Sequence, residues 1–154
     1  GIIRVAVFRH PDAAEVRAAL GFFTPDWLQT DAADFANDKW GLSPFVTPLP
    51  VYRDVPGLDE AAVRRAPRVL FEAASSGAGQ RVDWQRAAAL ARLTQLVLAG
   101  GLTPDNVGDA IAVVRPWGVD VSSGVERSPG VKDPGKIGAF VAAVRRAEAM
   151  LGGP

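Results

Sequence analysis

Two short turns made of small residues follow apolar segments in the second half of the sequence. Gly100-Gly101 comes after the apolar run Leu96–Leu98, and Ser122-Ser123-Gly124 comes after the segment 117–121. Small residues at the carboxyl ends of neighbouring parallel strands leave backbone N–H groups uncovered, and several such groups facing one point suit a phosphate. A single Gly-Gly turn more often only ends a strand. Two turns at consecutive strand–helix junctions predict a phosphate site.

Two carboxylates stand at strand positions where proton transfer is possible. Asp120 lies inside an otherwise apolar strand, and an unpaired carboxylate is costly to bury. Asp120 therefore either points into a polar opening or forms a salt bridge with a neighbouring loop. Glu72 follows the apolar residues Leu70 and Phe71, where a carboxyl group can act as a general acid. The alternative for Glu72 is a solvated carboxylate at a strand end.

The remaining candidates are single polar residues. His10 is the only histidine, and a lone histidine after a strand is more often a loop residue than a base. Without cysteine or a histidine cluster, we expect no transition-metal site. Lys132 either adds positive charge near the second turn or is simply solvated. The tryptophans, such as Trp84 at a helix start and Trp117 at a strand start, are expected to be structural.

Composition indicates one ordinary globular domain. The 154 residues are 48% hydrophobic and 22% charged, and the 17 basic and 17 acidic side chains cancel. This balance gives no support for a nucleic-acid or membrane-surface partner. No apolar run approaches the roughly 18 residues that a membrane span needs. The lack of cysteine is compatible with a cytoplasmic location.

The turns and carboxylates need a scaffold of alternating strands and helices. Strands are expected near residues 2–8, 27–29, 45–51, 68–71, 96–98 and 117–121, and helices near 13–20, 32–39, 58–65, 83–93, 103–114 and from 134 onward. Pro48 and Pro50 predict irregular pairing for the third strand. Thr103 is expected to cap its helix, with Pro104 at the first helical position. In the last helix, Ile137, Phe140, Val141 and Val144 are expected on one buried face. The alternation, at roughly 25 residues per strand–helix unit, predicts a parallel sheet covered by helices.

Two segments carry a resemblance to a known family. LAGGLTPDNV, followed by RPWGVDVSSGVERSPGVKDPGKI, closely resembles the carboxyl-terminal part of the phosphoribosylanthranilate isomerases of tryptophan biosynthesis. Looser similarity continues upstream through RVLFEAASSGAGQRVDW, LPVYRD, DWLQTDA and RVAVF. The resemblance implies an α/β fold, a (β/α)8 TIM barrel. It covers nearly the whole chain as one barrel domain over residues 1–154, but not the whole enzyme.

The resemblance also implies that part of the barrel lies outside this sequence. A closed barrel needs eight strand–helix units and usually about 250 residues. The six units here match strands three to eight, which leaves out the first two units. The family's general base is a cysteine at the end of the first strand, and an arginine after the second strand helps to hold phosphate. We expect that the biological chain continues upstream or that this is a fragment, because an open barrel exposes apolar edges.

The family reaction assigns roles to the candidate residues. It is an Amadori rearrangement that converts N-(5'-phosphoribosyl)anthranilate to 1-(2-carboxyphenylamino)-1-deoxyribulose 5-phosphate. Glu72 falls at the position of the general acid, where most relatives have aspartate, and Asp120 falls near the anthranilate end of the substrate. Many relatives have histidine where Asp31 stands, so no role transfers to Asp31. Arg53 is a candidate for binding the anthranilate carboxylate, and the alternative is an exposed arginine that makes no such contact. The residues implied to hold the ribose 5-phosphate are Gly100, Gly101, Ser123 and Gly124.

The resemblance implies no cofactor, since the chemistry is proton transfer alone. The implied partner is a phosphorylated small molecule, and the protein is expected to be a monomer or a homodimer. One alternative is another phosphate-binding barrel enzyme, such as a histidine-pathway isomerase or a pentose-phosphate epimerase. The other is non-catalytic: a fragment or degenerate homologue that binds phosphorylated ligands or completes a partner's barrel.

Overall fold

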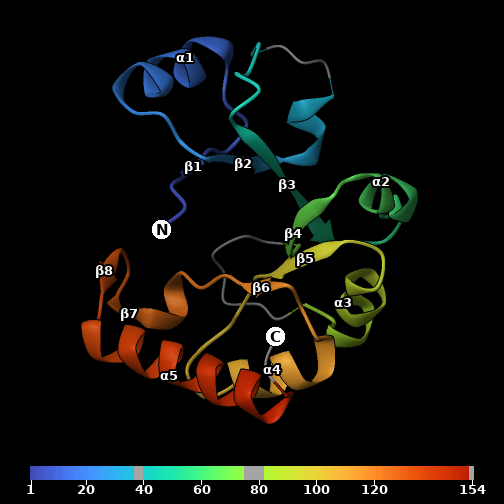
Figure 1. Ribbon diagram of the computed structural model, residues 1–154, viewed down its shortest axis with the longest axis vertical. Helices are drawn as coiled ribbons and strands as arrows, with labels where there is room; N and C mark the ends of the chain where they lie inside the picture. The colour runs from blue at the N-terminus through green and yellow to red at the C-terminus, as the bar shows by residue number, and fades with distance from the viewer. Residues whose placement is uncertain (37–39, 75–81, 153–154) are drawn as a thin grey trace. The chain divides into compact units, whose positions relative to one another are not determined.

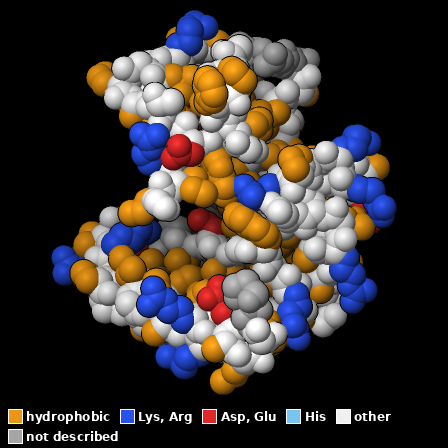
Figure 2. All heavy atoms as spheres, in the orientation of Figure 1, with side chains coloured by type: hydrophobic (Ala, Val, Ile, Leu, Met, Phe, Trp, Pro, Cys, Tyr) orange, Lys and Arg blue, Asp and Glu red, His pale blue; other side chains and the backbone are white. Residues whose placement is uncertain are grey.

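The computed structural model describes residues 1–36, 40–74 and 82–152 (Figure 1). The predicted glycine-rich loop at 75–79 lies outside these residues, as does the end of the helix expected at 32–39. The chain divides into two compact units, Gly1–Tyr52 and Arg53–Pro154. Among the described residues, no helix is long and apolar enough to cross a membrane. On the face shown in Figure 2, Lys and Arg side chains are scattered rather than gathered into one basic patch.

The first unit contains a parallel sheet with helices between its strands. Strand β1 pairs in parallel with β2, and β2 pairs in parallel with β3. The hydrophobic core between sheet and helix contains the buried residues Val16, Leu28, Trp40 and Val46. The elements are β1 (Val5–Val7), α1 (Ala13–Phe22), β2 (Trp27–Asp31), the 3-10 helix η1 (Ala32–Phe35) and β3 (Thr47–Asp54).

The second unit repeats the strand–helix alternation. Strand β4 pairs in parallel with β5, and β5 with β6. Helix α4 packs against both α3 and α5, and Figure 1 shows α5 lying alongside α4. The elements are α2 (Glu60–Arg65), β4 (Arg68–Ala73), α3 (Trp84–Ala91), β5 (Gln95–Leu98), α4 (Val107–Val114), β6 (Gly118–Val119), the 3-10 helix η2 (Ser123–Val125), β7 (Glu126–Ser128), β8 (Val131–Lys132) and α5 (Pro134–Met150).

Within the described residues, aspartate caps begin four of the five α-helices. The side chains of Asp12, Asp59, Asp83 and Asp133 each accept backbone N–H groups in the first turn of α1, α2, α3 and α5. At α1 the cap is a full capping box, because the Glu15 side chain also accepts the Asp12 backbone N–H. Such caps each contribute about 1 kcal/mol. The predicted starts of α3 at Asp83 and of α5 at Asp133-Pro134 are confirmed.

The prediction of irregular pairing around Pro48 and Pro50 was wrong. Strand β3 pairs with β2 in continuous register, with Leu28 opposite Pro48 and Thr30 opposite Pro50. The Thr47 backbone N–H donates to the Asp26 carbonyl of the preceding loop. Successive residues of a strand direct their backbone N–H groups to opposite sides. Because Thr47 directs its N–H toward the β2 side, Pro48 and Pro50 are at positions that face away from β2, where β2 needs no donor from them.

The prediction of the buried face of the last helix was only partly right. On α5 the buried residues are Phe140, Ala143 and Ala147, whereas Ile137 and Val141 are 41% and 42% exposed. After Phe140 the buried positions of α5 are thus small alanines, and this helix packs against α4. The sequence analysis did not predict the antiparallel hairpin of β7 and β8, which precedes α5.

Candidate active site

The ends of three parallel strands place Glu72 and Asp120 in one row. Phe71 in β4 is opposite Leu98 in β5, and Leu98 is opposite Val119 in β6. Glu72 and Asp120 each come one residue later. The Asp120 backbone N–H donates to the Leu98 carbonyl at 2.8 Å, which fixes its place at the end of β6. The register therefore brings both predicted carboxylates to the same edge of the sheet.

Asp120 has a perturbed proton affinity. Burial raises the pKa of its carboxyl group, the negative charge of Glu72 raises this pKa further, and the positive charge of Lys132 opposes both effects. Asp120 is nevertheless exposed to solvent, so only part of its carboxyl group loses water. The sequence left two alternatives for Asp120: its side chain points into a polar opening, or it forms a salt bridge with a loop. The environment described here fits the first alternative better.

Glu72 has an arginine partner. The Arg53 Nη1 atom lies 2.7 Å from Glu72 Oε1, and the two side chains are 25% and 18% exposed. Arg53 stands near the end of β3 and Glu72 near the end of β4. The residue predicted to bind the anthranilate carboxylate thus contacts the predicted general acid instead. A substrate carboxylate would have to compete with Glu72 for this guanidinium.

The two predicted phosphate turns touch each other. Gly100 and Gly101 both have positive φ, at 90° and 66°, a backbone conformation that favours glycine. Gly124 packs against the backbone that follows them: a Cβ atom at Gly124 would overlap the Leu102 carbonyl oxygen and come within 3.3 Å of Thr103 Cα. Only a residue without a side chain fits there. The prediction that these turns converge is supported by this contact.

Asn106 holds the first turn in place. Its side chain is 9% exposed, accepts the Thr103 backbone N–H at 2.9 Å and donates to the Gly101 carbonyl at 2.9 Å. Helix α4 begins at Val107, after a turn over residues 104–106. The expectation that Thr103 caps the helix with Pro104 at its first position was therefore wrong, because Asn106 is the N-cap residue. The sequence analysis did not single out Asn106.

The second turn is held from the β7–β8 hairpin. Lys132 Nζ donates to the Ser122 carbonyl at 2.9 Å and to Glu126 Oε1 at 2.7 Å, with Ser122 Oγ at 3.2 Å. Lys132 is therefore engaged rather than simply solvated. Its partner Glu126 was not predicted. The signal for the hairpin was available in Ser128-Pro129-Gly130, a turn sequence between two short segments.

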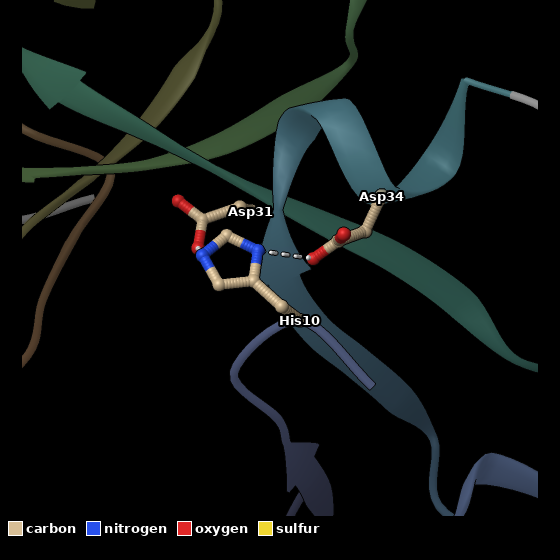
Figure 3. Close-up of side chains that lie close together, drawn as sticks. All are labelled: His10, Asp31 and Asp34. Atoms are coloured by element: carbon tan, nitrogen blue, oxygen red, sulfur yellow. Dashed lines mark ion pairs between the residues drawn. The ribbon is translucent and has the colours of Figure 1, made fainter. Parts of the chain in front are cut away.

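A separate cluster in the first unit surrounds His10 (Figure 3). His10 has a positive φ of 49°, and its imidazole lies between the carboxylates of Asp31 and Asp34. Nε2 is 3.3 Å from Asp31 Oδ2, and Nδ1 is 3.3 Å from Asp34 Oδ2. The buried Thr30 hydroxyl donates to Asp34 at 2.7 Å.

The two carboxylates of this cluster lie on opposite sides of the imidazole. The three side chains lie close enough to share an ion. However, each carboxylate faces a different ring nitrogen, whereas a metal ion takes only one nitrogen of an imidazole. The arrangement agrees with the prediction that His10 is a loop residue.

The sequence of this chain is similar to those of known enzymes of one family. The family model described as N-(5'phosphoribosyl)anthranilate (PRA) isomerase matches residues 3–143. The chain is 72% identical to the N-(5'-phosphoribosyl)anthranilate isomerase of Roseiflexus castenholzii over 71 residues, which are 46% of this chain and 33% of that protein. It is 43% identical to the corresponding enzyme of Roseiflexus sp. strain RS-1 over 150 residues, 93% of this chain and 70% of that protein.

Solved structures agree with the sequence relatives. The phosphoribosyl anthranilate isomerase of Thermus thermophilus superimposes with a TM-score of 0.79 at 25% identity, covering 94% of this chain and 73% of that one. A phosphoribosyl anthranilate isomerase crystallised with reduced 1-(o-carboxyphenylamino)-1-deoxyribulose 5-phosphate gives 0.71 at 26% identity, covering 94% and 72%. The α/β fold of parallel strands and helices is shared. The chain belongs to the N-(5'-phosphoribosyl)anthranilate isomerase family.

Proposed function

We propose that this chain carries the phosphate site and the proton-transfer carboxylates of an enzyme that isomerises N-(5'-phosphoribosyl)anthranilate. The observation that carries the proposal is the joint placement of two elements in the second unit. Glu72 and Asp120 lie at the ends of β4 and β6, the two strands that flank β5, and the glycine turn after β5 contacts the turn after β6. Parallel strands with catalytic groups and a phosphate site at their carboxyl ends are typical of (β/α)8 barrels. We assign the six units to strands three to eight of one such barrel domain.

The phosphate site is assigned to the two turns. Gly100 and Gly101 have the backbone freedom that lets N–H groups face an anion, and Gly124 keeps the second turn close to the first. Ser123 is exposed and offers a hydroxyl as well as its backbone N–H. A doubly charged phosphate bound here orients the ribose toward the row of carboxylates at the strand ends.

Proton transfer is assigned to the carboxylates. In the proposed mechanism Glu72 protonates the furanose ring oxygen, the C1′–O bond breaks, and the nitrogen lone pair forms a Schiff base. A base then removes the C2′ proton, which gives the enamine that tautomerises to the ketone product. Arg53 is placed to release Glu72 and bind the anthranilate carboxylate when substrate enters.

One observation favours a second assignment of the two roles. The pKa of Asp120 is raised by burial and by Glu72, which suits a group that carries a proton. Glu72 pairs with Arg53, which suits an ionised carboxylate. In this assignment Asp120 is the acid and Glu72 is the base. The pH dependence of kcat in Glu72→Gln and Asp120→Asn distinguishes the two: loss of the acid removes the alkaline limb of the profile, and loss of the base removes the acid limb.

Binding of a product analogue tests the proposed function. Reduced 1-(o-carboxyphenylamino)-1-deoxyribulose 5-phosphate should bind in a calorimetric titration, and the same compound without phosphate should bind at least about 100-fold more weakly. Two charge-assisted hydrogen bonds to phosphate account for a loss of this size. Equal affinity for both compounds would refute the phosphate assignment. A non-catalytic binding protein would pass this test and fail a turnover assay. We further propose that the protein is cytoplasmic, that it is a monomer or a homodimer, and that it needs no cofactor.

A further inference from the structure

We infer that Lys132 is a positioning residue, which holds the Ser122–Gly124 turn in its phosphate-binding conformation and does not itself bind phosphate. This inference rests on the proposed function of that turn. It assigns the β7–β8 hairpin a task that neither the sequence motif nor the family relationship supplies. The evidence lies in how the turn is anchored and in how the donors of the lysine are used.

The turn has little internal support. Helix η2 is a three-residue 3-10 helix without a side-chain cap. The backbone hydrogen bond from Val125 N–H to the Ser122 carbonyl is 3.3 Å long, and Ser122 has the irregular dihedral angles φ −121° and ψ −84°. Such a short turn needs an external partner to keep one conformation.

Lys132 supplies that partner. Its ammonium group has three N–H donors, and three acceptors lie within reach: the Ser122 carbonyl at 2.9 Å, Ser122 Oγ at 3.2 Å and Glu126 Oε1 at 2.7 Å. All donors are therefore directed at the turn and at Glu126. A phosphate contact would require one of these bonds to break.

Glu126 fixes the lysine in turn. Its other carboxylate oxygen, Oε2, accepts the Gly130 backbone N–H at 3.1 Å, which ties the carboxylate to the tip of the hairpin. The side chain is 15% exposed, compared with 45% for Lys132. Lys136 Nζ donates to the Glu126 carbonyl at 2.6 Å from the first turn of α5. The hairpin tip thus holds the Glu126 carboxylate, and the start of α5 holds the Glu126 backbone carbonyl. The carboxylate in turn holds Lys132, and Lys132 holds the turn.

The charge balance supports positioning over direct binding. The salt bridge to Glu126 offsets the positive charge of Lys132, which weakens its attraction for a phosphate. If Lys132 bound phosphate directly, removal of the Glu126 charge would free the lysine and tighten binding. If Lys132 positions the turn, the same change loosens the lysine and weakens binding. The two roles therefore predict opposite signs for Glu126→Gln.

The test uses Lys132→Met, Glu126→Gln and the control Arg127→Met. Arg127 is an exposed cation on the same hairpin and has no ion pair within residues 1–36, 40–74 and 82–152. The probes are the reduced 5-phosphate analogue, titrated by calorimetry, and hydrogen exchange of the Val125 and Glu126 amides, whose bonds to Ser122 and Ser123 carbonyls close the turn. Exchange requires no ligand and so reports on the turn even without binding.

Lys132→Met should speed hydrogen exchange of both amides at least about tenfold. It should also lower the affinity for the analogue about 10- to 100-fold, as expected for loss of charge-assisted hydrogen bonds. Glu126→Gln should shift both readouts in the same direction by less, and Arg127→Met should change neither. Unchanged exchange in Lys132→Met, or tighter binding in Glu126→Gln, would overturn the inference. Faster exchange in Lys132→Met with no analogue binding by the parent protein would support the positioning role and refute the proposed function instead.

Discussion

The Arg53 guanidinium and the Glu72 carboxylate meet at 2.7 Å near the ends of β3 and β4. Each was predicted to contact the substrate at a different point. Their pairing means that the ligand-free site neutralises its own charges. Under the proposed function, an anthranilate carboxylate at Arg53 would compete with Glu72, which would couple substrate binding to the release of Glu72.

Replacing Glu72 by glutamine should abolish proton transfer but retain binding. Glutamine keeps the shape of the side chain and one acceptor, but it neither donates nor takes up the catalytic proton. We expect kcat to fall by at least about 100-fold, the usual contribution of a general acid or base. Affinity for the reduced analogue should be retained or rise, because a neutral side chain competes less well for Arg53. Glu60→Gln in the first turn of helix α2, an exposed glutamate outside the strands, is the matched control. Parallel loss of affinity and kcat in Glu72→Gln would remove the general acid–base role.

Replacing Gly124 by valine should separate the two turns. Any side chain at this position collides with the Leu102 carbonyl, so the turn must shift and the phosphate contacts are lost. We expect KM to rise at least about tenfold and the free energy of unfolding to fall by about 1–3 kcal/mol, a typical cost of overpacking.

Gly108→Ala in α4 provides the control for Gly124. A Cβ atom at Gly108 meets nothing within 4 Å, so alanine there should raise the free energy of unfolding by about 0.5–1 kcal/mol through helix propensity. Urea unfolding of both variants measures the two effects. If Gly124→Val were as stable and as tight-binding as the parent, the contact between the turns would have no functional meaning.

Replacing Asn106 by alanine should loosen the first turn. The change removes one accepted and one donated hydrogen bond from a buried site and leaves Thr103 N–H and the Gly101 carbonyl without that partner. We expect a loss of about 1–2 kcal/mol in the free energy of unfolding together with weaker analogue binding. Asn106→Asp retains only the acceptor and should fall between the parent and alanine. Equal stability of all three proteins would contradict the assigned role.

Replacing Asp120 by asparagine should stabilise the fold at neutral pH. Burial and Glu72 raise the pKa of Asp120, so folding favours the protonated form. The stability that the protonated group contributes is present at pH values below its unfolded pKa and is lost as pH rises through the higher folded pKa. Asparagine avoids that loss.

Thermal unfolding across pH measures this effect. The melting temperature of Asp120→Asn should exceed that of the parent at pH 7, and the difference should shrink as pH falls toward the ordinary aspartate pKa near 3.9. Activity should fall while stability rises. A variant less stable than the parent at pH 7 would show that the charged carboxylate is well paired in the folded protein.

The sequence predicted features that are encoded by neighbouring residues. The aspartate before α3 and the Asp133-Pro134 start of α5 are local signals, and both were found in place. The convergence of the glycine turns followed from parallel topology, because strand ends of one sheet share an edge. Asp120 was likewise recognisable as a carboxylate in an apolar strand.

Contacts between distant residues were not predictable in the same way. The Arg53–Glu72 pair depends on side-chain directions at two strand ends, and the Lys132–Ser122 contact depends on a hairpin that places β8 beside the turn. The buried face of α5 was predicted only in part because helix periodicity favours large apolar residues. The actual contact with α4 uses alanines, whose small size permits close approach.

Turnover of N-(5'-phosphoribosyl)anthranilate tests the central claim most directly. The intact mass of the purified protein should be recorded first, since 16.2 kDa corresponds to this sequence alone. Consumption of the fluorescent substrate is then followed in the parent protein and in Glu72→Gln. We predict consumption by the parent and its loss in the variant. If the parent protein binds the analogue in a separate titration but consumes no substrate, the enzymatic role is contradicted and a phosphate-binding protein remains.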